Sequence, residues 1–195
     1  MGNLHSVKKT LDRMGANAFI SSDPQALQHA DKIILPGVGH FATAMNNLNA
    51  LHLSEELHEA VQVKKIPVLG ICLGMQLMAT HSEEGNIKGL GWFDATVVKF
   101  NVEGKSPLKV PHMGWNSANP TRTSPLTHGL SEEAEFYFVH AYHWKSNTNE
   151  EVIQQTTYGY SFPSAIQQHH IFAVQYHPEK SHEYGVFVLK NFIQY

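Results

Sequence analysis

The chain has 195 residues, 42% of them hydrophobic, and is long enough to bury a sizeable core. Its formal net charge of −3 at pH 7 gives no reason to expect a nucleic-acid or membrane partner. One cysteine excludes an internal disulfide, and no apolar run reaches the roughly 18 residues that cross a bilayer. With no charged-then-apolar leader, these features predict a single cytoplasmic domain over residues 1–195.

Helical and strand-like patterns alternate along the first half of the chain. Apolar residues from Leu4 to Met14 recur at helical spacing and predict a first helix, which Asn3 can cap and Gly15 can end. The predicted elements that follow are a strand (17–21), a short helix (24–30), a strand (31–37), helical residues 40–64, a buried strand (66–71) and a helix (74–81).

The second half is richer in strand patterns. Residues 92–100, 135–144 and 172–178 predict strands of a second, more antiparallel part, and residues 183–193 predict a closing helix. The alternation indicates an α/β fold in which helices flank a central, mostly parallel sheet, with an antiparallel part added.

The only cysteine lies between glycines, in Gly70-Ile71-Cys72-Leu73-Gly74, where a strand pattern turns into a helix pattern. A nucleophile at such a turn stands above the sheet, and the start of the helix supplies free N–H groups that favour a thiolate. The alternative is a buried structural cysteine, a common role for a free thiol.

A cysteine nucleophile needs a base, and "QYHPEKS" (175–181) supplies His177 with Glu179 two residues later. In an extended segment stiffened by Pro178, both side chains would project to the same side, so Glu179 could orient the imidazole. Alone, this pair could equally be a histidine and a glutamate of a surface loop.

An oxyanion site is the remaining requirement, and "LPGVGHF" (35–41) ends another predicted strand with Gly37 and Gly39 around Val38. Such a loop can present backbone N–H groups to the nucleophile, although a plain turn has the same pattern.

P-G-V-G, G-I-C-L-G-M-Q and H-P-E, in this order, resemble the motifs of class I (triad) glutamine amidotransferases. "MGNLHSVKKTL", "PGVGHF", "VPHMGWN" (110–116) and "FYFVHAYH" (136–143) further resemble the glutaminase subunits of imidazole glycerol phosphate synthase, an enzyme of histidine biosynthesis.

The resemblance implies a glutaminase that hydrolyses glutamine to glutamate and ammonia through the triad Cys72, His177 and Glu179. It also implies an oxyanion hole and a glutamine site, and the chemistry requires no metal or cofactor. The oxyanion donors would be the backbone N–H groups of Val38, Gly39 and Leu73, and the glutamine site would comprise Gly37, Gln76 and Glu84.

The resemblance also implies a heterodimer with a cyclase subunit of (β/α)8-barrel fold, to which the ammonia passes. The expected interface residues are Asn3, His112, Met113, Trp115, Asn116 and Lys180. Relatives usually begin with a strand of roughly eight residues ahead of M-G-N-L, which is missing here. We expect its absence to expose apolar surface and leave backbone groups unpaired.

Three other functions fit parts of this pattern. A close paralogue could supply ammonia to a different synthase, for example one that aminates a surface-sugar or nucleotide precursor. A cysteine hydrolase acting alone, such as a peptidase or γ-glutamyl hydrolase, would need no partner. A non-catalytic assembly subunit would keep its function without Cys72.

Overall fold

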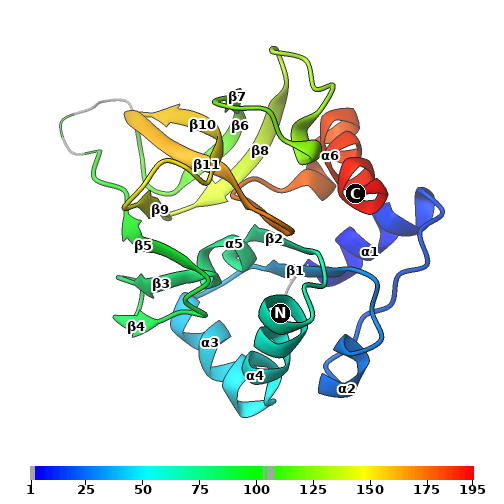
Figure 1. Cartoon of the computed structure of the whole chain (residues 1–195). Coiled ribbons are helices and arrows are strands. Elements are labelled where there is room, and N and C mark those ends of the chain that lie inside the picture. The colour runs from blue at the N-terminus through cyan, green and yellow to red at the C-terminus, as the bar shows by residue number, and fades with distance from the viewer. Residues whose placement is uncertain (1–2, 103, 105–107) are drawn as a thin grey trace.

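A computed structural model describes residues 3–102, 104 and 108–195. In this part of the chain the strands form three sheets, with helices on both faces of the largest (Figure 1). The largest sheet has the order β1 (Ile33–Gly37), β2 (Val68–Cys72), β12 (Ile171–Val174), β11 (Tyr160–Gln168), β10 (Val152–Tyr158), β7 (Asn119–Pro120). The second has the order β4 (Ile87–Lys88), β3 (Ala79–Ser82), β5 (Phe93–Lys99), β9 (Tyr142–Ser146), and the third pairs β6 (His112–Ser117) with β8 (Glu135–His140).

The large sheet is mixed, which confirms the predicted α/β class with an antiparallel part. Strands β1, β2 and β12 run parallel, whereas β11, β10 and β7 continue the sheet with antiparallel pairings. The prediction for residues 172–178 was wrong in one respect, because β12 lies in the central sheet beside β2. Its four residues are all buried, as expected for a strand covered on both faces.

Helices cover both faces of the parallel part and create two hydrophobic cores. One face carries α3 (Phe41–Ala50), α4 (Leu53–His58), the π-helical turn η1 (Glu59–Val63) and α5 (Leu73–Leu77), and the other carries α1 (Leu4–Arg13) and α6 (His182–Gln194). Successive residues of β2 alternate between the cores, so that Val68 packs with the first group and Leu69 with the second. This strand is therefore the shared wall of both cores.

The remaining short elements are α2 (Pro24–Leu27) and the 3-10 turns η2 (Pro125–Thr127) and η3 (Pro178–Lys180). None of the helices in the described residues is long and apolar enough to cross a membrane.

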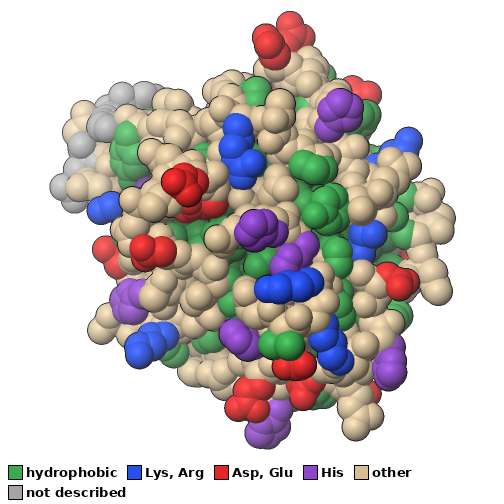
Figure 2. All heavy atoms as spheres, viewed as in Figure 1, with side chains coloured by type: hydrophobic (Ala, Val, Ile, Leu, Met, Phe, Trp, Pro, Cys, Tyr) green, Lys and Arg blue, Asp and Glu red, His purple; other side chains and the backbone are tan. Residues whose placement is uncertain are grey.

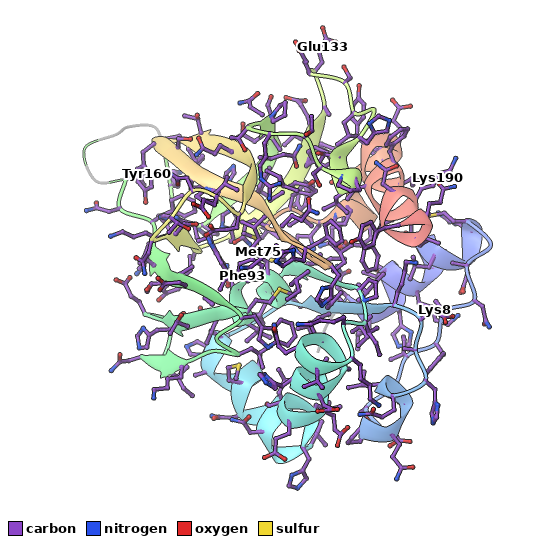
Figure 3. All side chains as sticks on the ribbon, viewed as in Figure 1. Lys8, Met75, Phe93, Glu133, Tyr160 and Lys190 are labelled. Carbon is purple, nitrogen blue, oxygen red and sulfur yellow. The ribbon has the colours of Figure 1, made fainter. Side chains whose placement is uncertain are left out.

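On the face that Figure 2 shows, acidic and basic side chains are interspersed. Figure 3 shows Lys8, Glu133 and Lys190 pointing outward, while Met75 of α5 lies inside.

Most predicted helices are present, with differences at some of their ends; the helix predicted at 24–30, for example, ends at Leu27. The helix expected at 74–81 stops at Leu77, because Ala79–Ser82 pairs with β4 and β5 as strand β3. Asn3 precedes α1 but makes no side-chain cap, since its backbone has a φ of 81° and its amide points elsewhere.

The predicted strand at 17–21 is wrong. These residues form no strand, and Phe19 and Ile20 are 66% and 39% exposed. An extended segment becomes a strand only when another backbone pairs with it, and no described strand lies beside this one. Strand β1 pairs only with β2 among the described strands, and it therefore forms an edge of the large sheet.

The glycines around Cys72 are required by close backbone packing between β1, β2 and α5. A Cβ at Gly74 would lie 1.7 Å from the backbone oxygen of Leu35, and one at Gly70 would lie 2.9 Å from the backbone of Gly74. Both separations are far below van der Waals contact, so only glycine allows α5 to sit directly on β1.

We expect Gly74→Ala to lower the free energy of unfolding by at least about 3 kcal/mol, because the added methyl group must displace the backbone of β1. Gly91→Ala is the control: Gly91 has a φ of 69° with open space around it, so its replacement adds backbone strain of about 1 kcal/mol only. Urea unfolding of both variants measures the difference, and equal losses would contradict the packing argument.

Candidate active site

Cys72 lies at the junction of β2 and α5 in a strained backbone conformation. Its φ is 54° and its ψ is −109°, a region that non-glycine residues rarely adopt, and α5 begins at the next residue. The residue is 6% exposed. Strain of this kind persists only where the surrounding packing imposes it, and here the contact of Gly74 with Leu35 does so.

His177 and Glu179 form a buried pair just beyond the end of β12. Nδ1 of His177 donates to Oε1 of Glu179 over 2.8 Å, and both side chains are fully buried. The expected extended geometry was wrong, because Pro178 begins the 3-10 turn η3 and Lys180 N–H bonds back to the His177 carbonyl. Proline suits this place, since its fixed φ fits the first position of a helical turn.

The His177 backbone is held on both sides. Its N–H donates to the carbonyl of Tyr137 over 2.9 Å, and its carbonyl accepts from the Ser181 hydroxyl over 2.7 Å. The same hydroxyl oxygen accepts from the N–H of Tyr137, so β8, β12 and η3 are tied together at this point.

The electrostatics of His177 favour its protonated form. Burial lowers the pKa of His177, but the nearby Cys72 sulfur and the Glu179 carboxylate raise it from 6.5 to about 9. Nε2, the nitrogen not used by Glu179, has no partner with normal hydrogen-bond geometry. It is therefore free to exchange a proton with the thiol or with a substrate.

Asn3, which the resemblance places at the interface, contacts the same pair. Its side-chain amide donates to Oε1 of Glu179 and lies 3.3 Å from Nδ1 of His177. Two donors thus converge on one carboxylate oxygen and restrain it.

The glycine-rich loop lies beside the cysteine because of sheet register. Gly37, the last residue of β1, pairs with Cys72 across the parallel ladder, so Val38 and Gly39 follow at the same edge. Gly39 has a φ of 110°, which requires glycine. Leu73 is the first residue of α5, and the N–H groups of a first helical turn have no partner within the helix.

Gln76 and Glu84 are both engaged with the protein. Gln76 is buried, and its Nε2 donates to the carbonyl of Tyr142 and to Oε1 of Gln175, each over 3.0 Å. Glu84 accepts from the N–H of Phe41 over 2.8 Å. It thereby satisfies a free N–H at the start of α3, the helix that follows the glycine loop.

The predicted interface residues divide into outward and inward groups. Met113 and Trp115 are 61% and 45% exposed, and Trp115 stacks on His182 at 4.9 Å. Lys180 is exposed and lies 5.6 Å over the ring of Tyr137.

His112 does not face solvent as expected, because alternation along β6 turns it inward, where it is 2% exposed. Asn116 is half-buried, and its amide donates to the carbonyl of Thr157.

Gln175 was not singled out by the sequence reasoning. It lies two residues before His177, and in an extended segment such residues project to the same side, which could have drawn attention to it. No group of three or more histidine, cysteine or acidic residues in the described ranges is placed to hold a metal ion.

The sequence matches the family described as glutamine amidotransferase class-I over residues 4–194. Two solved structures share its fold with TM-scores of 0.74. One is a putative GMP synthase component from Thermoplasma acidophilum, 21% identical and covering 99% of this chain and 88% of its own. The other is a glutamine amidotransferase that is 18% identical, and the match covers 99% of this chain and 93% of that one. The chain belongs to the class I glutamine amidotransferases.

Close relatives narrow the family further. The imidazole glycerol phosphate synthase subunit HisH 1 of Campylobacter jejuni is 47% identical, over 99% of this chain and 95% of the relative. HisH 2 of Methanococcus maripaludis is 43% identical and HisH 2 of Pseudomonas aeruginosa is 41% identical. Each match covers 100% of this chain and 95% of the relative. Within its class, the chain is a member of the HisH family.

We expect Glu179→Gln to lower the pKa of His177 from about 9, because burial continues to disfavour the imidazolium and only Cys72 remains to raise the pKa. NMR titration of the imidazole Cε1–H signal, assigned by its absence in His177→Gln, measures the shift. Glu183→Gln, an exposed change in the first turn of α6, should leave the value unaltered.

The same interaction makes stability depend on pH. Since the folded pKa of His177 exceeds the unfolded value of 6.5, its stabilising contribution is complete below pH 6.5 and disappears as pH rises through 9. The stability difference between the native protein and Glu179→Gln should therefore be larger at pH 6 than at pH 9.5. A difference that did not change over this range would contradict the assigned pKa.

Proposed function

We propose that this chain is the glutaminase subunit of an imidazole glycerol phosphate synthase, acting in the cytoplasm as one domain over residues 1–195. The observation that carries the proposal is the buried His177–Glu179 pair beside the strained turn of Cys72, in a chain 47% identical to a HisH protein. A strained turn costs stability, and a buried ion pair is a weak source of stability compared with apolar packing, so their joint presence favours a catalytic role over a structural cysteine.

The geometry supports a two-step hydrolysis. His177 takes the thiol proton of Cys72, and the thiolate sulfur attacks the side-chain carbonyl carbon of glutamine. The tetrahedral intermediate collapses as its C–N bond breaks, and His177 gives its proton to the departing ammonia. Water then attacks the glutamyl thioester, with His177 as base, to release glutamate and restore the thiol. Glu179 keeps the imidazole in the required orientation throughout.

The backbone around Cys72 is suited to stabilise the oxyanion. We assign the donors to the N–H of Leu73 at the start of α5 and to the N–H of Val38 or Gly39 in the glycine loop. Each such donor typically contributes about 3–4 kcal/mol to lowering the barrier. Gly37, Gln76 and Glu84 are assigned to the glutamine site, where the amide of Gln76 and the loop end held by Glu84 form rigid walls.

The ammonia requires an acceptor, and the partner we propose is a cyclase subunit of (β/α)8-barrel fold that forms a heterodimer with this chain. The exposed side chains of Met113, Trp115 and Lys180 form the contact surface of the proposed heterodimer, with Asn116 at its edge. His112 contributes from behind as a buried support for β6. Asn3 is assigned to the same interface, and its amide also donates to Glu179.

A second candidate is a paralogue that supplies ammonia to a different synthase. One strain of Methanococcus maripaludis carries both HisH 1 and HisH 2, which are 40% and 43% identical to this chain. Two copies in one organism allow one of them to serve another acceptor, so the cyclase partner must be tested directly.

We expect glutamate release from glutamine in the presence of the cyclase partner and its nucleotide ligand, and at least about a thousandfold less from Cys72→Ala. The appearance of imidazole glycerol phosphate identifies the cyclase pathway. Glutamate release without ring closure would favour the paralogue. A folded protein that released no glutamate with any acceptor would overturn the glutaminase assignment.

A further inference from the structure

Gln175 touches the nucleophile but has no step in the two-step hydrolysis. It is fully buried just after β12, and its Nε2 lies 3.7 Å from Sγ of Cys72, within hydrogen-bonding distance for sulfur. Its Oε1 accepts from Nε2 of Gln76 over 3.0 Å. The side chain thus bridges the first turn of α5 and the reactive sulfur.

The orientation of the Gln175 amide is set, through Gln76, by the backbone carbonyl of Tyr142, which can accept a hydrogen bond but cannot donate one. The two hydrogens of the Gln76 amide go to the backbone carbonyl of Tyr142 and to Oε1 of Gln175. Turning either amide over would place oxygen against oxygen or NH₂ against NH₂. The carbonyl of Tyr142 therefore fixes Gln76, and Gln76 fixes Gln175 with its NH₂ toward the sulfur.

A buried chain of imidazoles holds the same carbonyl from the other side. Nδ1 of His140 donates to the carbonyl of Tyr142 over 2.7 Å. Nε2 of His140 is 3.1 Å from Nδ1 of His112, and Nε2 of His112 is 3.2 Å from Nδ2 of Asn116. The contacts run without interruption from half-buried Asn116 on β6 to the sulfur of Cys72.

The chain has a single direction because both histidines are neutral. Burial lowers the pKa of His140 to about 3 and that of His112 to about 4. A neutral imidazole has one donor and one acceptor. Since His140 must donate through Nδ1, its Nε2 accepts from His112, whose own Nε2 accepts from Asn116.

We propose that Gln175 is a positioning residue that donates a hydrogen bond to the Cys72 sulfur, and that the chain Asn116–His112–His140 holds in place the Tyr142 carbonyl that orients the two amides. The inference rests on the proposed glutaminase function, which it deepens. A donor aimed at the sulfur stabilises the thiolate relative to the thiol and holds it opposite the free Nε2 of His177.

The test is the pH profile with which iodoacetamide alkylates the thiol, followed by mass spectrometry of the intact protein. Cys72 is the only cysteine, so every thiol adduct reports on it. His177 interacts with both Cys72 and Glu179, so the ionisable side chains of His177 and Glu179 bear on the alkylation profile. These stay unchanged in the variants.

We expect Gln175→Met, which keeps the unbranched length but removes the donor, to raise the alkylation midpoint by about one pH unit, with about tenfold slower reaction below it. Gln175→Glu should raise it further, because it replaces the donor with an acceptor. Gln154→Leu is the matched control: Gln154 is equally buried and loses bonds to Ala118 and Tyr176, but it does not touch the sulfur. Its midpoint should equal that of the native protein.

Further outcomes decide each half of the proposal. A native-like profile in Gln175→Met or Gln175→Glu, with the fold intact by circular dichroism, would overturn the role of Gln175. His140→Phe should raise the midpoint as well and slow alkylation below it by about threefold. An unchanged profile would overturn the role of the histidine chain. Alkylation needs neither glutamine nor a partner. If the thiol profiles are as expected but the glutaminase assay fails, the proposed function is rejected and the role of Gln175 stands.

Discussion

The close contact of α5 with β1 is the constraint on which the rest of the site depends. Gly74 lies so near the Leu35 carbonyl that no side chain fits between them. With the helix held there, the preceding residue must turn sharply out of β2, and Cys72 takes its positive φ. The register of β1 on β2 pairs Gly37 with Cys72, so the glycine loop lies beside the proposed nucleophile.

Parallel strand order then brings the residues of the proposed triad together from distant parts of the sequence. Strands β1, β2 and β12 are adjacent and run in one direction, so their carboxyl ends meet at one edge of the sheet. The glycine loop, Cys72 and His177 follow these three ends in turn. The antiparallel strands contribute by holding His177 through the backbone of Tyr137 on β8.

The interior around the site is unusually polar for a core, yet most of its groups are paired. Gln76, Gln175, His112 and His140 satisfy one another and the carbonyl of Tyr142, which offsets the cost of removing them from water. Nε2 of His177 and Oε2 of Glu179 are left without partners. These unpaired atoms lie where the proposed mechanism requires a proton to move and a carboxylate to remain charged.

Local sequence determined much of this protein: the helix at Leu4–Arg13, the strands that end at Gly37 and Cys72, the closing helix and the order of the motifs. These features depend on side-chain periodicity and on backbone needs that glycine alone meets. The tertiary structure decided what depends on neighbours. Residues 17–21 lack a pairing strand, β12 joins the central sheet, and Asn3 turns to Glu179 instead of capping its helix. Strand pairing and buried hydrogen bonds join residues far apart in the chain, and a local pattern carries no record of which partner each will meet.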